Sequence, residues 1–206
     1  MEKCLNPFVV RKALKHLRSS DKALSELIEK HGPCSIKPSL DNPFHALASS
    51  IISQQISWRA ARTIRARLLT LIGDAQFDPE RLLKISPARL RGAGLSSAKA
   101  TYILGIAKTL QKGAFSFSAI MNYKDEDVIN ELTALPGVGR WTAEMFLIFG
   151  LGRPDVLSVN DAGLKKGFEL TYRLKNAPSA SEMIELGERW RPYRSVASWY
   201  LWRALD

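Results

Sequence analysis

A carboxylate that follows a glycine-rich turn is the feature of this sequence best suited to chemistry. Residues 136–139 read Pro-Gly-Val-Gly, and Asp161 follows about twenty residues later, at the expected start of a helix. Proline ends a helix, and glycine lets the backbone approach a ligand closely. The next helix then begins with unpaired N–H groups and the positive end of its dipole, which together bind phosphate well. The turn therefore predicts a phosphate-binding site, and Asp161 a catalytic carboxylate.

Both features also have a simpler structural interpretation. A tight corner between two helices uses the same Gly-x-Gly spacing, which is weak evidence when it stands alone. Asp161 or Asn160 would also serve as an ordinary helix cap. The functional interpretation is favoured because the turn, the helix that follows it and the aspartate occur together.

The segment 132–161 resembles the helix-hairpin-helix of a DNA glycosylase superfamily named for its hairpin, its Gly/Pro-rich loop and its aspartate. Residues 135–143, Leu-Pro-Gly-Val-Gly-Arg-Trp-Thr-Ala, match the hairpin residue for residue. Residues 158–161, Ser-Val-Asn-Asp, end where the family keeps its essential aspartate. The resemblance covers about Phe44 to Trp202 and is greatest to the AlkA-type 3-methyladenine DNA glycosylases.

The resemblance assigns DNA binding to the hairpin and to an earlier loop. Enzymes of this kind flip the target base out of the duplex, because a stacked base is out of reach. Gln55 stands where relatives carry the side chain that fills the resulting gap, although a polar helix end would also place a glutamine there. Lys99 would contact a phosphate. The hairpin would contribute DNA contacts from Gly137, Val138, Gly139, Arg140 and Thr142.

The family's hairpin often holds a monovalent cation on backbone carbonyls, and the resemblance places these carbonyls at Thr133, Leu135 and Val138. A Na+ or K+ ion at that place would help to neutralise the DNA phosphate. No other cofactor is expected. An iron–sulfur cluster needs four cysteines, and the chain has only Cys4 and Cys34.

One position separates the branches of the superfamily. Bifunctional members carry a lysine just after Gly-x-Gly-Arg, and its amine attacks the sugar and cuts the strand; this chain has Trp141 there. An indole is no nucleophile, so the resemblance implies a monofunctional enzyme. The resemblance places Trp141, Trp202 and Met145 in the lining of the base pocket. There, an indole face would attract an electron-poor alkylated purine. Both tryptophans would also suit a core, and Met145 lies where some relatives have a tyrosine, which leaves the substrate range open.

The composition agrees with a polyanionic partner. Among 206 residues, 46% are hydrophobic and 24% charged, and 30 Lys and Arg against 20 Asp and Glu give a net charge of +10. Such an excess favours nucleic acid without proving it. No apolar run resembles a signal peptide or approaches the length of a membrane span. We expect a soluble monomer that binds damaged double-stranded DNA, cytoplasmic in a prokaryote or nuclear in a eukaryote.

Apolar spacing and cap residues predict helices throughout the chain. The spacing indicates helices over 8–18, 20–30, 43–56 and 124–134, and a further helix between a Ser57 cap and Gly73. Ser179 and Glu182 fit a capping box that starts a later helix. The 57–73 helix carries Arg59, Arg62, Arg65 and Arg67, which would lie on a solvated face or contact a DNA backbone.

The sequence thus predicts an all-α fold of two helical lobes, with the active site in the cleft between them. One lobe would comprise residues 41–152 and contain the hairpin; the other would combine 1–40 with 153–206. The predicted function is hydrolysis of the N-glycosidic bond of alkylated purines in DNA, with Asp161 as the catalytic residue. The alternatives are a glycosylase for another lesion, such as uracil or hypoxanthine, and a non-catalytic helix-hairpin-helix DNA-binding protein. A glycosylase that also cuts the strand is disfavoured by Trp141.

Overall fold

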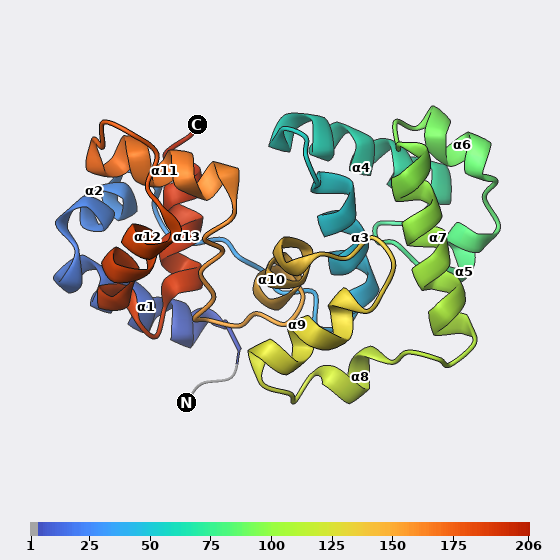
Figure 1. Cartoon of the computed structure of the whole chain (residues 1–206), viewed down its shortest axis with the longest axis horizontal. Helices are drawn as coiled ribbons and strands as arrows, with labels where there is room; N and C mark the ends of the chain where they lie inside the picture. Colours follow the sequence, from blue (N-terminus) through green and yellow to red (C-terminus); the bar gives the residue numbers. More distant parts are fainter. Residues whose placement is uncertain (1–3) are drawn as a thin grey trace. The chain divides into compact units, whose positions relative to one another are not determined.

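The computed structural model describes residues 4–206, and over this range the chain forms helices and no β-strand (Figure 1). The predicted all-α class is confirmed. Residues 1–3, which the sequence analysis assigned to the second lobe, lie outside the described residues. The chain divides into two compact units. One is Ser39–Phe146, and the other combines the residues before Ser39 with Leu147–Asp206. The two units meet after Phe146, inside a helix, whereas the sequence predicted a boundary after residue 152.

The unit 39–146 contains the hairpin and the loop that carries Gln55. Helix α3 packs against α4 and α7, and the short helices α5 and α6 pack against α7. Its helices are α3 (Pro43–Ser53), α4 (Trp58–Ile72), α5 (Pro79–Leu83), α6 (Pro87–Gly92), α7 (Ser97–Gln111), α8 (Phe117–Ile120), α9 (Asp125–Thr133) and most of α10 (Arg140–Phe149).

Cap residues fix the ends of these helices where the sequence indicates. The Ser57 hydroxyl accepts a hydrogen bond from the Ala60 N–H at 3.2 Å and starts α4. Gly73 ends that helix with φ 70°, in the left-handed region that favours glycine. Asp78 and Ser86 cap α5 and α6 in the same way, each followed by a proline in the first turn. The predicted position of α4, between Ser57 and Gly73, is confirmed.

The second unit is built around α13 (Arg194–Arg203), which packs against α1, α2 and α11. The buried Asp21 joins three parts of this unit, because it caps α2 and accepts hydrogen bonds from Tyr172 Oη at 2.7 Å and Trp190 Nε1 at 3.0 Å. Burial and the Asp21 carboxylate raise the pKa of Tyr172. The other elements are α1 (Pro7–Ser20), α2 (Lys22–His31), α11 (Ala162–Tyr172), α12 (Ala180–Gly187) and a short 3-10 helix (Glu188–Trp190).

Helices α11 and α13 approach each other closely because Gly167 has no side chain. A Cβ atom at Gly167 would lie 2.3 Å from the carbonyl oxygen of Leu201, so a larger residue would force the helices apart. This contact brings Trp202 of α13 to the start of α11. Over residues 4–206, no helix has the length and apolar character that crossing a membrane requires.

Candidate functional site

The glycine-rich turn between α9 and α10 is closed by a short backbone bond and by an aromatic ring. The Val138 N–H donates to the Leu135 carbonyl at 3.1 Å. Gly137 has φ 78°, and a Cβ atom there would lie 2.1 Å from the ring of Tyr102 on α7. A Cβ at Gly139 would meet no heavy atom within 4 Å. Gly137 is therefore required by the packing, whereas Gly139 leaves open space over the turn.

Helix α10 begins directly after this turn, as the sequence predicts. Its first backbone bond runs from the Ala143 N–H to the Gly139 carbonyl at 3.1 Å. The positive end of the helix dipole lies at this turn, so its start has the character of an anion site. Val138 is buried at 5% exposure, as part of the hydrophobic core.

Gln54 braces the turn from the end of α3. Its side-chain amide nitrogen donates to the Gly137 carbonyl and to the Thr142 hydroxyl, both at 2.9 Å. The side chain of Thr142 is thereby buried against Gln54. Sequence reasoning did not identify Gln54, although the adjacent pair of glutamines at a helix end was a signal that one of them has a structural partner.

Lys99, a predicted phosphate contact, has a structural role at the end of α3. Its ammonium group donates to the carbonyls of Ile52 at 2.8 Å and Gln54 at 2.7 Å, and so caps the C-terminal end of α3. A cation suits these carbonyls because the end of a helix is the negative end of its dipole. Partial burial lowers the pKa of Lys99. Lys99 and Gln54 together connect α7, the end of α3 and the hairpin.

We expect Lys99→Met to lower the melting temperature without changing the salt dependence of DNA binding. The substitution keeps the aliphatic stem but removes two charge-assisted hydrogen bonds, each worth roughly 1.5–3 kcal/mol. Thermal unfolding and DNA titrations at several salt concentrations measure the two effects. Lys108→Met, an exposed change on the same helix, is the control. If Lys99→Met instead reduces the slope of log K against log[salt] by about one, Lys99 contacts a phosphate.

Gln55 is presented to solvent in an unusual backbone conformation. It is exposed, and its φ of 55° lies in the left-handed region, which non-glycine residues rarely adopt. Such a conformation costs about 1 kcal/mol or more, and strained residues of this kind cluster at functional sites. Because its neighbour Gln54 is anchored by both side chain and backbone, the strain is held in place. This geometry favours an inserting role for Gln55.

Arg140, another predicted DNA contact, is paired with two carboxylates in the structure. Its guanidinium forms a bidentate pair with Glu126 at 3.0 and 2.6 Å and a further bond to Glu144 at 3.1 Å. The hydrogen bonds that Arg140 donates to Glu126 raise the pKa of Arg140 and lower the pKa of Glu126. With two carboxylates around it, this cation joins α9 to α10, and its predicted contact with DNA stays a prediction.

Asp161 caps α11 and is held by a tryptophan. Its Oδ1 atom accepts hydrogen bonds from the backbone N–H of Leu164 and from Trp202 Nε1, the latter at 2.9 Å. The residue is 9% exposed. The cap that sequence reasoning kept as an alternative is therefore present, and it fixes the direction of the carboxylate.

Trp202, a predicted base-pocket residue, donates its indole N–H to Asp161. Its ring lies 5.9 Å from that of Phe149, centroid to centroid, at a tilt of 32°. Trp202 is half-buried, and its predicted contact with a base stays a prediction for the exposed part of the ring. The sequence contained no signal for the bond between its indole and the carboxylate 41 residues away.

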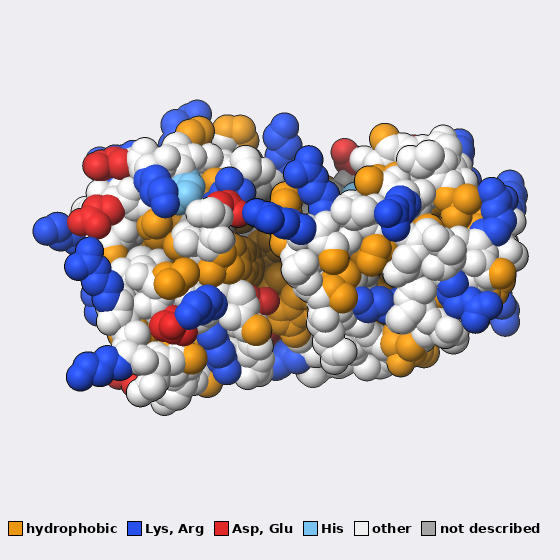
Figure 2. Space-filling view, turned by 90° about the horizontal axis from the view of Figure 1, so that it is seen from above, with side chains coloured by type: hydrophobic (Ala, Val, Ile, Leu, Met, Phe, Trp, Pro, Cys, Tyr) orange, Lys and Arg blue, Asp and Glu red, His pale blue; other side chains and the backbone are white. Residues whose placement is uncertain are grey.

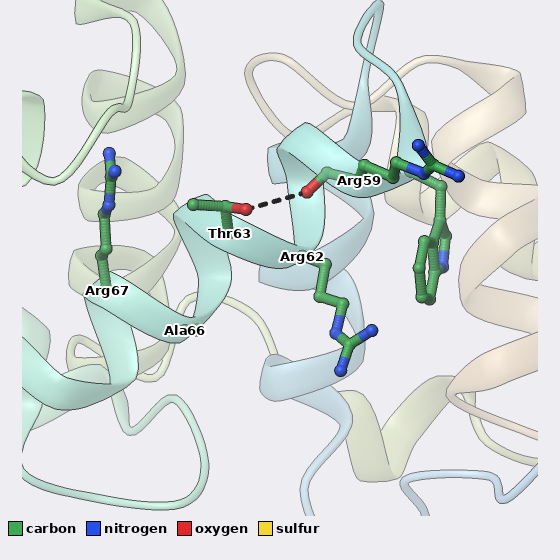
Figure 3. A pocket seen from close by; sticks show the side chains of 6 residues that line it. Arg59, Arg62, Thr63, Ala66 and Arg67 are labelled. Atoms are coloured by element: carbon green, nitrogen blue, oxygen red, sulfur yellow. Dashed lines mark hydrogen bonds between the residues drawn. The ribbon is translucent and has the colours of Figure 1, made fainter.

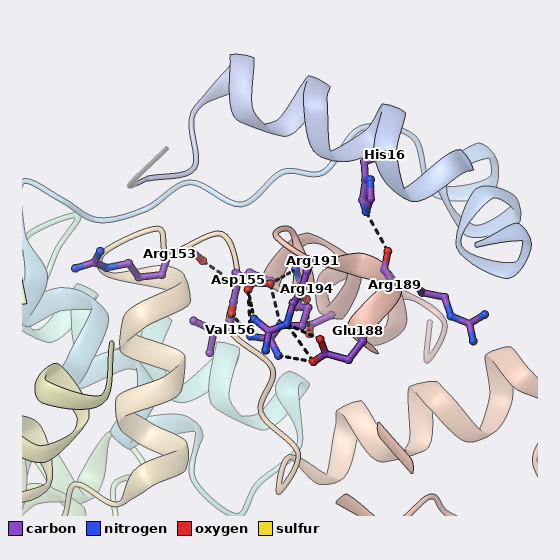
Figure 4. A network of polar contacts seen from close by, with 10 residues as sticks. His16, Arg153, Asp155, Val156, Glu188, Arg189, Arg191 and Arg194 are labelled. Atoms are coloured by element: carbon purple, nitrogen blue, oxygen red, sulfur yellow. Dashed lines mark hydrogen bonds and ion pairs between the residues drawn. The ribbon is translucent and has the colours of Figure 1, made fainter. Parts of the chain in front are cut away.

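The loop that leads to Asp161 is fixed against the first turn of α13. The Ser195 hydroxyl donates to the Arg153 carbonyl at 2.7 Å and accepts from the Val156 N–H at 2.9 Å. Asp155 pairs with Arg191 at 2.7 Å and with Arg194 at 2.8 Å (Figure 4). Helix α13 therefore holds this segment near its beginning through Ser195 and at Asp161 through Trp202.

The two other predicted pocket residues lie one helical turn apart on α10. Trp141 is half-buried, whereas Met145 is 5% exposed. Their side chains face the same side of the helix, because residues i and i+4 do so. Their contact with a base stays a prediction.

The comparisons with known proteins agree with this geometry. Residues 48–192 match the family of HhH-GPD superfamily base excision DNA repair proteins. The chain is 33% identical to the alkylbase DNA glycosidase-like protein mag2 of Schizosaccharomyces pombe, over 94% of this chain and 92% of that protein. It is 30% identical to DNA-3-methyladenine glycosylase 1 of the same yeast, over 93% of this chain and 86% of that protein.

Solved structures give the same result for the fold. The structure of Schizosaccharomyces pombe 3-methyladenine DNA glycosylase Mag1 in complex with abasic DNA matches with a TM-score of 0.84 at 30% identity, covering 93% of this chain and 95% of that one. A DNA-3-methyladenine glycosidase from Bacillus halodurans matches with a TM-score of 0.71 at 38% identity, covering 98% and 91%. With the hairpin and the capped aspartate in place, the chain belongs to the HhH-GPD superfamily of base excision DNA repair proteins.

Proposed function

We propose that this protein is a monofunctional DNA glycosylase of base excision repair, which hydrolyses the N-glycosidic bond of alkylated purines. The observation that carries this proposal is Asp161, a carboxylate fixed by the start of α11 and by Trp202, in a chain that also contains the family's hairpin. Relatives similar over most of this chain are named 3-methyladenine DNA glycosylases, which supports 3-methyladenine as the first substrate.

The chemistry assigned to Asp161 is electrostatic and requires a fixed charge. Cleavage of an N-glycosidic bond builds positive charge on the sugar, as in the oxocarbenium-like state of glycoside hydrolysis. A carboxylate held in position stabilises that charge and can orient or deprotonate the attacking water. Because Oδ1 already accepts two hydrogen bonds, the carboxylate need not reorganise as the charge develops.

DNA would be held by the hairpin and by the loop after α3. The start of α10 offers backbone N–H groups to a phosphate, and Gly139 leaves room for that phosphate to approach. Gln55 would enter the duplex after base flipping and fill the vacated space. Its amide could also hydrogen-bond the base left without a partner.

A cation at the hairpin is a further part of the proposal. The carbonyls of Thr133, Leu135 and Val138 would hold Na+ or K+, since carbonyl oxygens are hard ligands that suit such ions. The Leu135 carbonyl already accepts the Val138 N–H, but a carbonyl has a second lone pair. When bound, the ion would reduce the negative charge of the neighbouring phosphate.

Strand cleavage is not expected. Trp141 occupies the position of the lysine nucleophile, and an indole forms no Schiff base. Lys165 and Lys166 follow Asp161, and Lys166 is paired with Glu169 at 2.5 Å. We therefore expect a monomeric enzyme whose product is an intact strand with an abasic site.

Base release from methylated duplex DNA tests this function. The freed bases are separated by identity, and the DNA is examined for strand breaks before and after alkali. We expect release of 3-methyladenine, with breaks only after alkali. Strand breaks before alkali, together with an enzyme–DNA Schiff base that borohydride traps, would identify a glycosylase/lyase. Release of uracil or hypoxanthine alone would change the substrate, and binding without release of any base would indicate a non-catalytic DNA-binding protein.

A further inference from the structure

The first turns of α4 expose a tryptophan among arginines. Trp58 is 62% exposed, more than the other large apolar side chains on the described surface. It begins α4 directly after the Ser57 cap. Together with residues of the next two turns it lines a shallow depression. The lining consists of Trp58, Arg59, Arg62, Thr63, Ala66 and Arg67, which we call the α4 platform (Figure 3).

The charge of the α4 platform is not balanced by acidic groups. Helix α4 contains no Asp or Glu, and the structure of residues 4–206 shows no ion pair for Arg59, Arg62 or Arg67. Other arginines are used differently: Arg140 and Arg194, for example, are held by carboxylates. The side chains of Arg59, Arg62 and Arg67 project from α4 (Figure 3). Unbalanced cations on one helix repel each other, so an anionic partner would stabilise them.

The neighbouring groups show this crowding. The Arg62 guanidinium lies 5.4 Å from the centre of the Trp58 ring, a cation–π distance. Burial and the charge of Arg62 lower the pKa of Arg65, a half-buried residue of the same helix. Lys and Arg side chains are distributed over the face shown in Figure 2, in agreement with the net charge of +10.

The position of the α4 platform indicates which polyanion it would meet. Trp58 follows Gln55 by three residues, so the two lie within about 10 Å along the chain. The helix from Trp58 to Arg67 is about 13 Å long, a length over which one strand of B-DNA places about four phosphates. If Gln55 enters the duplex, the platform therefore meets the DNA backbone beside the lesion.

We propose that the α4 platform is a second DNA-binding surface, which grips the sugar-phosphate backbone of the duplex next to the flipped base. This inference rests on the proposed function, because it takes the orientation of DNA from Gln55. Arg59, Arg62 and Arg67 neutralise phosphates, and the Trp58 ring packs on a deoxyribose or on an exposed base. The hairpin and the platform then hold the DNA at two separate places in the unit 39–146.

Binding to a duplex with a tetrahydrofuran abasic analogue tests the platform without requiring base release. Fluorescence anisotropy is measured at several salt concentrations for Arg59→Gln, Arg62→Gln and Arg67→Gln. We expect each variant to reduce the slope of log K against log[salt] by about one, because each contact releases about one counterion. Arg11→Gln, an exposed change of equal charge on α1, is the control and should leave the slope unchanged.

Trp58 is tested by its own pair of variants. Trp58→Ala should weaken duplex binding about fivefold or more with an unchanged salt slope, as expected for loss of aromatic stacking, and Trp58→Phe should restore most of the affinity. Unchanged binding by the arginine and tryptophan variants would overturn the proposal. The proposal would also be overturned if these variants bound the duplex normally but lost binding to single-stranded DNA. The α4 platform would then bind unpaired nucleic acid.

Failure of the platform and failure of the proposed function give different results. A protein that binds the abasic duplex through α4 but releases no base would leave the platform intact and contradict the enzyme. A protein that releases 3-methyladenine normally, with binding and salt slope unaffected by the α4 variants, would contradict only the platform.

Discussion

Asp161→Asn is expected to lower the rate of base release at least about 100-fold, the usual cost of removing one electrostatic group from a transition state. The change removes the negative charge but keeps Oδ1, which can still accept from the Leu164 N–H and from Trp202. Asparagine is as good a helix cap as aspartate, so stability should change little. Single-turnover release of 3-methyladenine and thermal unfolding, measured on the same protein, test both parts.

Asp161→Ala is the matched comparison, because it removes both the charge and the cap. It should lose activity and also about 1 kcal/mol of stability. If the Asn variant keeps more than a tenth of the activity of the unmodified protein, Asp161 acts as a cap and the catalytic group lies elsewhere. If both variants bind the abasic duplex normally, the lost step is the chemistry and not DNA binding.

Local signals in the sequence were sufficient for most of the helices. Ser57 and Gly73 mark the two ends of α4, and Ser179 with Glu182 forms the predicted capping box at the start of α12. In each of these caps, the interacting residues lie within a few positions of each other, so a short stretch of sequence is enough to predict them. The helix predicted over 43–56 is wrong in its last turn, because α3 ends at Ser53. Its end is held by Lys99, which lies 47 residues further along the chain.

In the candidate site, too, local features could be predicted from the sequence and long-range contacts could not. The glycine turn, the start of α10 and the cap at Asp161 follow from residue types and spacing. The partners that orient them do not, because they come from distant segments: Gln54 reaches the turn across 83 residues, and Trp202 reaches Asp161 across 41. A glutamine or a tryptophan offers several uses, and only the folded chain selects one.

Charged residues were the hardest to interpret from sequence. A DNA contact by Arg140 is predicted from its place in the hairpin, and the pairs that it forms with Glu126 and Glu144 were not predicted. The arginines of α4 meet no such acids in the described chain, so the same residue type keeps its charge available there. Whether an arginine is paired depends on which carboxylates the fold places near it, and the composition of the chain does not contain that information.

Gly137→Ala is expected to disrupt the hairpin and weaken DNA binding more than tenfold. The methyl group would lie 2.1 Å from the Tyr102 ring, and the φ of 78° is unfavourable for alanine; the backbone strain alone costs about 1–3 kcal/mol. The turn must then move, and with it the carbonyl that Gln54 holds. Thermal unfolding and anisotropy with the abasic duplex measure the loss of stability and of affinity.

Gly139→Ala separates packing from phosphate binding in the same turn. Its methyl group would meet no atom of the protein within 4 Å, so the melting temperature should hardly change. A phosphate seated over the start of α10 would meet that methyl group, and DNA affinity should fall. Adding Tyr102→Ala to Gly137→Ala should restore part of the stability, because it removes the clash and leaves only the backbone strain. Normal DNA binding by Gly139→Ala would mean that the phosphate does not lie over this turn, and the hairpin would then be a structural corner whose glycine serves only the packing against Tyr102.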